Sequence, residues 1–237
     1  MSKISWIIRY TAFVLAFTFA FSCSGSDDGN TQVSGCPNAT TGNNTVSCDG
    51  QTYRTVQIGS QVWMAKNLDY NVNESRCNND LEANCVIYGR LYNWATAMAL
   101  PASCNGSLCA SQISAKHRGI CPSGWHIPSN DEWEALVNFV GGKEIAGTKL
   151  KTTSGWSDKG NGIELGNGTD DYGFSALPGG YGGTSGGFHD VGDEGYWWSS
   201  SESNGDNAYR RIMDLRESAT YLSRDKIRLY SVRCIKD

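Results

Sequence analysis

The side chains of this 237-residue chain with the most distinctive chemistry are its nine cysteines. A cysteine can act as a nucleophile, bind a metal, carry a lipid or form half of a disulfide. No two of the nine have the CxxC spacing of a zinc site, and the three histidines are scattered along the chain. We therefore expect disulfides, with zinc as the main rival, and the odd number leaves one cysteine for another role.

The odd cysteine is expected to be Cys23, which stands where an apolar segment changes to a polar one. The apolar run 10–21 is too short for a membrane-spanning helix, which needs roughly 20 residues, and is typical of a signal peptide. The sequence AFSC resembles a bacterial lipobox, although Phe21 is larger than the residue usual at its position. We expect residues 1–22 to be removed and Cys23 to be lipidated. The alternatives are ordinary cleavage, which leaves a free thiol, and an uncleaved anchor.

The other eight cysteines are an even set in a chain with an export signal, and an oxidising compartment favours disulfides. Eight cysteines allow 105 connectivities, and the sequence does not choose among them. Local spacing suggests three short loops and one long one. The pairs are Cys36–Cys48, Cys77–Cys85, Cys104–Cys109 and, closing a loop of about 110 residues, Cys121–Cys234.

The composition describes an acidic, turn-rich protein. The net charge is −4, and removal of residues 1–22 takes away two basic residues and no acidic one, which makes it −6. An acidic surface repels phosphate backbones, so nucleic acid is not expected as a partner. Residues 23–47 are rich in small and polar residues, which predicts a flexible tether. Residues 48–237 have the length of one domain with its own core.

Hydrophobic patterns predict several elements before the glycine-rich part of the chain. β-Forming residues alternate around a central glycine in segment 52–70, which predicts a hairpin. Segment 89–100 has apolar residues at helical spacing and ends before a proline. Ser129 and Glu132 form a capping box that starts a second helix. The buried stripe of that helix is expected to be Trp133, Leu136, Val137 and Val140.

The C-terminal part of the chain predicts strands in an antiparallel sheet. Alternation favours an inward face of Tyr230, Val232 and Cys234, with Ile227, Leu229, Ser231 and Arg233 on the other face. Trp197 and Trp198 are neighbours and point to opposite faces of a strand. At most one of them is therefore expected to be buried, and we expect Trp197 inside and Trp198 exposed.

Other patterns that could do chemistry are less specific. His126 has no acid or nucleophile at a catalytic spacing, so we interpret it as a packed, hydrogen-bonded residue. The segment GNGTDD resembles part of a calcium loop without the ligand spacing of an EF-hand, and turn chemistry explains it as well. A structural calcium is the only cofactor that the pattern suggests. The phosphate-binding motif GxxxxGK[ST] does not occur in the sequence.

Six blocks, all in the same order, resemble the Fibrobacter succinogenes major paralogous domain family. They are VWMAKNL, YGRLYNWATAM, CPSGWHIPSNDEWEAL, GTDDYGFSALPGGY, YWWSSSES and YSVRCIKD, between residues 53 and 237. Members of that family are typically lipid-anchored or secreted surface proteins of bacteria, which implies an outer-membrane or cell-surface location. The family has no established reaction to carry over, and a fold alone does not supply one.

The family is similar to the C-type lectin-like fold, near the branch that holds formylglycine-generating enzymes and retroelement-diversified receptors. This resemblance implies an α+β, loop-rich, disulfide-stapled fold with an antiparallel sheet and two main helices. In that fold a terminal disulfide joins the region before the first helix to the last strand, which would be Cys121–Cys234 here.

We expect a binding module for a glycan or protein ligand, without catalytic activity and attached to the membrane by its lipid. Binding residues tend to lie on long loops over a rigid sheet, and aromatic faces beside polar groups suit sugars or peptides. The candidates are Tyr181, Phe188, His189, Trp198, Glu202, Asn204, Asp206, Asn207, Tyr209 and Arg211. The rival classes are an enzyme of the formylglycine-generating type, which needs free thiols that a thiol count would detect, and an envelope structural protein.

Overall fold

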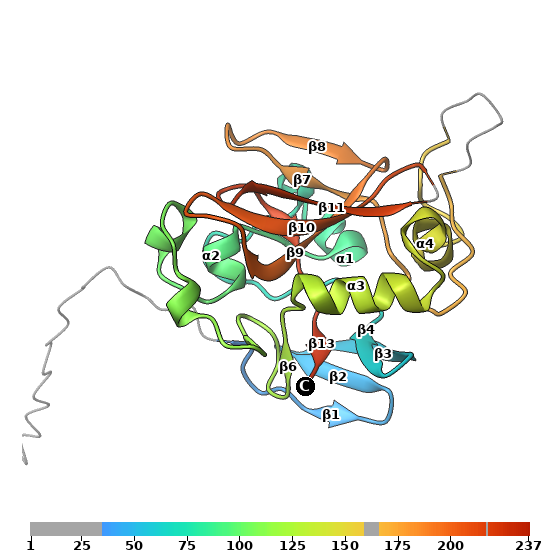
Figure 1. Ribbon diagram of the computed structural model, residues 1–237, viewed down its shortest axis with the longest axis horizontal. Helices are drawn as coiled ribbons and strands as arrows, with labels where there is room; N and C mark the ends of the chain where they lie inside the picture. The colour runs from blue at the N-terminus through green and yellow to red at the C-terminus, as the bar shows by residue number, and fades with distance from the viewer. Residues whose placement is uncertain (1–34, 159–165, 217) are drawn as a thin grey trace, which may run out of the picture. The chain divides into compact units, whose positions relative to one another are not determined.

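The computed structural model describes residues 35–158, 166–216 and 218–237, which form an α+β arrangement built on two sheets (Figure 1). The first sheet has six strands in the order β1-β2-β3-β4-β13-β6. Its strands are β1 (Thr41–Gly42), β2 (Thr45–Cys48), β3 (Gln51–Ile58), β4 (Gln61–Met64), β6 (Trp125–His126) and β13 (Ile235–Lys236). The hairpin predicted in segment 52–70 is confirmed as β3–β4, with Gly59 in the left-handed region (φ 61°) at its turn.

The second sheet has seven strands and carries the candidate site. Its main order is β11-β10-β9-β12-β5, and β7 pairs with both β9 and β8. The strands are β5 (Leu91–Tyr92), β7 (Gly179–Gly182), β8 (Phe188–Val191), β9 (Gly195–Glu202), β10 (Asn207–Met213), β11 (Ala219–Asp225) and β12 (Tyr230–Ser231). Most pairings are antiparallel, as expected, but β9 runs parallel to both β7 and β12.

The helices are short, and the longest lies between the two sheets (Figure 1). They are α1 (Glu82–Tyr88), α2 (Trp94–Ala97), α3 (Asn130–Phe139) and α4 (Lys143–Leu150), with 3-10 turns η1 (Asn78–Asp80), η2 (Ala102–Asn105) and η3 (Ala110–Gln112). The predicted capping box of α3 and its buried stripe are confirmed. Trp133 of α3 packs against Trp63 of β4 and Trp197 of β9, with ring centroids 4.8 and 6.3 Å apart, so this helix joins the cores of both sheets.

The helix predicted over 89–100 is wrong in its first part. Leu91–Tyr92 form β5 against β12, and only Trp94–Ala97 are helical. Asn93 separates the two elements, and its side-chain oxygen accepts a hydrogen bond from the backbone N–H of Thr96 as the cap of α2. Residues 90–98 are all buried, and in a fully buried segment the apolar pattern of a helix cannot be told from that of a strand.

Trp197 and Trp198 are both fully buried, with 0 % of their surfaces exposed, so the prediction that Trp198 is exposed is wrong. The two rings do lie on opposite faces of β9. Trp197 packs towards Trp133 of α3, and Trp198 packs edge-on against Tyr230, with centroids 4.6 Å apart. Alternation along a strand identifies two faces, but it does not say whether other elements cover both of them.

The segment after β11 shows the same effect. Leu229, Ser231 and Arg233, expected on the outer face, are buried like the three residues that alternate with them, whereas Ile227 is exposed. The guanidinium of Arg233 donates to the side-chain oxygen of Asn67 (2.6 Å from Nη2) and to a backbone carbonyl. Burial lowers the pKa of Arg233 to about 9.

Residues 35–47, which composition assigned to the flexible tether, contribute β1 and most of β2 to the first sheet. β2 pairs with β3 over its whole length, and Cys36 is buried and linked to Cys48. The backbone N–H of Cys36 donates to the carbonyl of Ile120 (3.2 Å). Composition misses this because a disulfide and strand pairing hold the segment in place of apolar side chains. The rest of the predicted tether, the signal peptide and Cys23 lie outside the described residues.

All eight cysteines from Cys36 onward are paired, in the four disulfides that local spacing favours. Cys121–Cys234 joins positions 113 residues apart, linking the chain before β6 and α3 to the chain before β13. No helix in the described parts of the chain is long and apolar enough to cross a bilayer.

Candidate functional site

The β7–β8 hairpin carries three of the candidate residues, Tyr181, Phe188 and His189. Tyr181 and Phe188 are half-buried, and His189 is exposed. The rings of Tyr181 and His189 lie side by side across the hairpin, with centroids 5.1 Å apart and planes inclined by 32°. The hairpin therefore presents an aromatic pair towards the solvent.

Glycine at position 180 brings this hairpin close to the sheet. Gly180 has φ +64°, and a Cβ there would lie 2.2 Å from the carbonyl oxygen of His189. It pairs with Gly195 of β9, so the two backbones approach where neither residue has a side chain. As a result Tyr181 lies over the sheet, with its ring centroid 5.3 Å from that of Tyr196 and 5.9 Å from that of Tyr230.

Two arginines stack on these tyrosines. The guanidinium carbon of Arg210 lies 4.3 Å from the ring centroid of Tyr196 and 4.8 Å from that of Tyr230. Arg228 lies 5.3 Å from the ring centroid of Tyr181. These are cation–π distances. We call these five residues, contributed by β7, β9, β10, β12 and the turn before β12, the tyrosine–arginine cluster.

Burial and the neighbouring charges shift the pKa values in the cluster. Burial raises the pKa of Tyr230 to about 12, although Arg210 and Arg228 act in the opposite direction. The pKa of Tyr196 is also raised, first by burial and then by Asp190 and Glu194. Its hydroxyl donates to those two carboxylates, at 2.8 and 2.5 Å. Tyr196 and Tyr230 therefore stay neutral at ordinary pH.

Four of these five residues were not among the sequence candidates, and one signal could have found part of the set. Arg210 lies directly across from Trp198 in the β9–β10 pair. Strand pairing counted from the β9–β10 turn is the signal that could have placed Arg210 beside Trp198. The count gives this pair only if the register shift between Ala208 and Arg210 is included. The contacts of Tyr230 and Arg228 come from a segment that is distant in the sequence, and no local pattern reports them.

Glu202, at the end of β9, has a structural role, because its carboxylate is bound by other parts of the protein. Its two carboxylate oxygens accept hydrogen bonds from the backbone N–H of Cys109 (3.0 and 3.2 Å), and one forms an ion pair with the buried ammonium of Lys226. The same ammonium donates to the carbonyls of Gly205 (2.8 Å) and Ser107 (3.1 Å). These bonds tie the β9–β10 turn to the Cys104–Cys109 loop.

The polar candidates in the β9–β10 turn mainly shape that turn. The side-chain oxygen of Asn204 accepts from the backbone N–H groups of Asp206 (3.0 Å) and Asn207 (2.9 Å). Such side-chain-to-backbone bonds are typical of Asx turns. Asn204 and Asp206 remain exposed, so they are available to a ligand, but at a distance along β9 and β10 from the tyrosine–arginine cluster.

Tyr209 and Arg211 face the other side of the sheet. Arg211 is buried and donates from Nη2 to Glu134 of α3 (2.8 Å), and burial lowers its pKa. Tyr209 pairs with Tyr221 of β11, with ring centroids 5.9 Å apart. The ten sequence candidates therefore do not form one site, because they divide between the β7–β8 hairpin, the β9–β10 turn, the interior and the far face.

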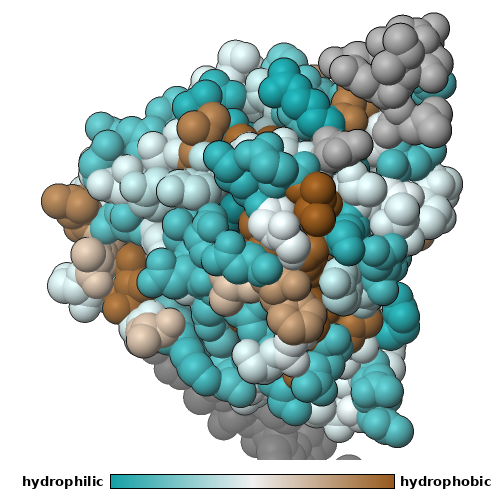
Figure 2. Space-filling model, turned by 45° about the vertical axis from the view of Figure 1, so that its right-hand side comes forward, coloured by the Kyte–Doolittle hydropathy of each residue, from teal (hydrophilic) through white to brown (hydrophobic). Residues whose placement is uncertain are grey.

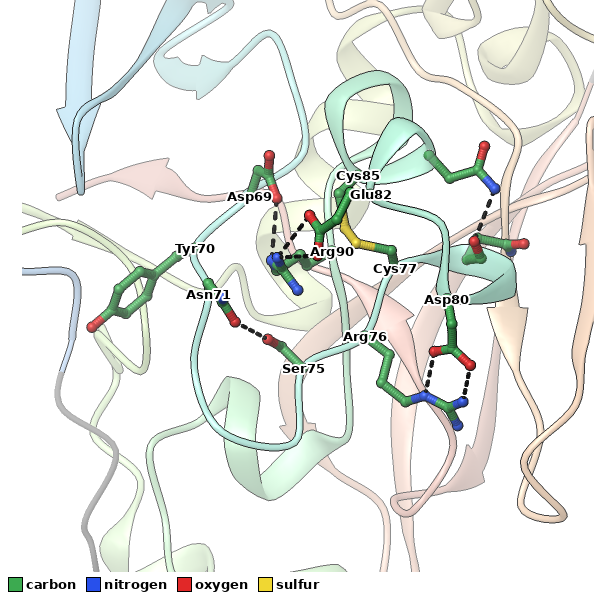
Figure 3. Close-up of a disulfide and its surroundings, with 12 residues drawn as sticks. Asp69, Tyr70, Asn71, Ser75, Arg76, Cys77, Asp80, Glu82, Cys85 and Arg90 are labelled. Carbon is green, nitrogen blue, oxygen red and sulfur yellow. Dashed lines mark hydrogen bonds and ion pairs between the residues drawn. A yellow bond between two sulfur atoms is a disulfide. The ribbon is translucent and has the colours of Figure 1, made fainter.

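The one possible group of metal-binding side chains found among the described residues is Cys77, Glu82 and Cys85. Both cysteines are joined in a disulfide, which removes their thiolates (Figure 3). Figure 3 also shows Arg90 between Glu82 and Asp69, with Nη2–Oε1 and Nε–Oδ1 distances of 3.1 and 3.4 Å. This arrangement is a structural ion-pair network around the disulfide.

The GNGTDD segment is bonded as a turn. Asp170 accepts from the backbone N–H and the hydroxyl of Ser175, both at 2.7 Å, and Asp171 forms an ion pair with Lys149 (3.5 Å). Asn167 accepts from the backbone N–H of Trp156 (3.1 Å). The carboxylates that could bind calcium thus already have partners within the protein, as the turn-chemistry alternative expects.

The surface drawn in Figure 2 is mostly hydrophilic, with separate hydrophobic patches. A large continuous apolar patch would point to a protein-docking or membrane-docking surface, and this face shows none. A hollow of about 250 Å³ lies beside Asp190 and Glu194, the carboxylates that accept from the hydroxyl of Tyr196. It is lined by Asp190, Asp193, Glu194, Asp214, Leu215 and Arg216.

Comparison with known proteins supplies a family. Comparisons with curated proteins and with solved structures each gave no match. The match to a protein family covers most of the chain and includes the whole second sheet and the first sheet from within β3 onward. Residues 56–236 match the Fibrobacter succinogenes major domain, and the chain therefore belongs to that family.

Proposed function

We propose that this protein is a binding module, displayed on the bacterial surface by an N-terminal lipid, which recognises a ligand through the β7–β8 hairpin and the tyrosine–arginine cluster and catalyses no reaction. The observation that carries the proposal is the placement of Tyr181. Its ring is half-exposed, pairs with His189 in the solvent, and rests on Tyr196, Tyr230 and Arg228. A rigid aromatic side chain with polar neighbours is a common energetic anchor in recognition.

A C-type lectin-like fold is the second part of this proposal. Two observations support it: β13, near the C-terminus, pairs with β4 and β6, and Cys121–Cys234 joins the chain before α3 to the chain before β13. Because the disulfide and the pairing of β13 hold the two ends of the domain together, the second sheet is a rigid support for its loops. Loops and hairpins on such a support are available for binding.

The cysteines support binding over the formylglycine-generating type of chemistry. That chemistry needs reactive thiols, and each of the eight cysteines from Cys36 onward is in a disulfide. We assign the ninth, Cys23, to the lipid anchor in the outer membrane or cell surface.

Removing the exposed aromatic pair should abolish most of the binding. The full chain, purified in detergent, would be probed on an array of glycans and proteins, and the hits measured by calorimetry. We expect Tyr181→Ala and His189→Ala each to weaken binding at least about tenfold, which corresponds to about 1.4 kcal/mol.

Tyr209→Ala is the matched control, because Tyr209 is also half-buried and ring-paired but lies on the other face of the sheet. Thermal unfolding of each variant separates lost affinity from lost stability. Unchanged affinity in a folded Tyr181→Ala protein would show that the ligand binds elsewhere.

A further inference from the structure

Arg210 differs from the other buried arginines, because none of the described residues is its hydrogen-bonding or ionic partner. Arg211 is paired with Glu134, Arg233 with Asn67, and Arg90 with Asp69. Within the parts of the chain that the structure describes, Arg210 makes no hydrogen bond and no ion pair, and Nε and Nη1 are enclosed without an acceptor. Only 7 % of its surface is exposed. Nη2 makes no hydrogen bond to the described residues and is not among the enclosed nitrogens.

Three arginines gather on the side of Arg210 that faces Tyr230, and two carboxylates lie on the side of the Tyr196 hydroxyl. Arg210, Arg228 and Arg224 all act on the buried Tyr230 and favour its ionised form. The carboxylates at this position, Asp190 and Glu194, accept the hydroxyl of Tyr196.

A buried cation is unfavourable unless it is paired, and the two tyrosine faces offset only part of that cost. None of the described residues therefore supplies an anion that pairs with the Arg210 guanidinium. A guanidinium binds a carboxylate with charge-assisted hydrogen bonds, and desolvation by the surrounding rings strengthens them.

We infer that the ligand is a saccharide with a carboxylate group, such as a uronic acid, whose carboxylate binds at the open edge of the Arg210 guanidinium beside Tyr230. This inference rests on the proposed function and names the ligand class for the same face. The rings of Tyr181 and His189, which lie nearer the solvent, would contact the apolar face of the sugar. The saccharide is favoured over an acidic peptide because the exposed part of the cluster consists of ring faces.

The test compares acidic oligosaccharides with their own neutral esters. Oligomers of galacturonate, glucuronate and mannuronate, each with its methyl ester, would be titrated into the full chain in detergent at low salt. We expect at least one acid to bind tenfold or more tightly than its ester, and this preference to fall as salt is added. Arg210→Gln should reduce the affinity for the acid to that for the ester.

Arg54→Gln is the matched control, because it removes the same charge from an exposed arginine on β3 of the first sheet, outside the cluster. It should leave the preference unchanged. Arg210→Lys keeps the charge without the planar fork and should retain only part of the preference. Thermal unfolding identifies any variant that fails to fold, and the comparison of acid with ester in the wild type does not depend on any variant.

Each other outcome contradicts the inference in a distinguishable way. If acid and ester bind equally and Tyr181→Ala still lowers the affinity for both, the inference of a carboxylate is wrong and the proposed function still stands. If polyglutamate binds and none of the oligosaccharides does, the inference that the ligand is a saccharide is wrong. If none of these probes binds and the array shows no Tyr181-dependent ligand, the inference and the proposed function both fail.

Discussion

At the scale of single residues, His126 shows how a buried ionisable group can be structural. It is 1 % exposed, and its two ring nitrogens face Asp237 Oδ1 (2.7 Å) and Glu132 Oε1 (2.9 Å). Burial alone lowers the pKa of His126, but the two carboxylates outweigh it and the pKa is raised. The sequence interpretation of a packed, hydrogen-bonded histidine is confirmed.

This histidine predicts a pH-dependent stability. A raised folded-state pKa stabilises the fold fully below the unfolded-state pKa of about 6.5, and the contribution is lost as the pH rises through the folded-state value. We expect His126→Gln to reduce the free energy of unfolding by about 2 kcal/mol at pH 5.5. At alkaline pH, where the histidine of the wild type is neutral, we expect a reduction of about 1 kcal/mol. Urea unfolding at both pH values measures this.

Glu132 acts in the acid range and must be kept apart from this effect. Its pKa is lowered because His126 and Ser129, taken together, outweigh burial, so its contribution is lost only as the pH falls through that lowered value. Measurements at and above pH 5.5 avoid it. A stability difference between wild type and His126→Gln that did not change with pH would show that the histidine is neutral in the folded protein.

At the scale of elements, the disulfides differ in the length of chain that they close. Cys104–Cys109 closes a separation of 5 residues around the 3-10 turns, whereas Cys121–Cys234 closes one of 113 and joins α3 and β6 to the last strand. Chain-entropy estimates give about 2 kcal/mol for the short loop and about 5 kcal/mol for the long one.

Removing the long disulfide should therefore cost more than removing the short one. We expect the pair Cys121→Ser and Cys234→Ser to lower the unfolding free energy by about 2–5 kcal/mol, a large share of the total of a typical domain. The pair Cys104→Ser and Cys109→Ser is the control. Guanidinium unfolding of the three oxidised proteins gives the ranking, and a larger loss in the control would contradict the loop-entropy explanation.

At the scale of the whole molecule, the proposed function requires an anchor before the described domain. We propose Cys23 for the lipid because the sequence changes there from apolar to polar and the other eight cysteines are paired. We expect radioactive fatty acid to label the wild type in bacterial cells and not Cys23→Ala, which should appear in the soluble fraction. Equal labelling of both proteins would contradict lipidation at this position.

Local patterns in the sequence predicted the features whose partners are close along the chain. The capping box of Ser129 and Glu132, the β3–β4 hairpin and the three short disulfides join residues no more than 12 positions apart. The pair Cys121–Cys234 was then the one left over. In these cases backbone geometry and short loops leave few alternatives, so residue type and spacing are enough.

Only the tertiary structure decided which side chains are buried and which charges are paired. Trp198 and Arg211 are inside because separate elements cover both faces of β9 and β10, and Glu202 is bound to Lys226 from a strand end 24 residues away. Arg210 lies against tyrosines from β9 and β12 and has no acidic partner among the described residues. Burial and electrostatic pairing depend on residues brought together from distant parts of the chain. The alternation of side chains along a single strand does not identify those residues.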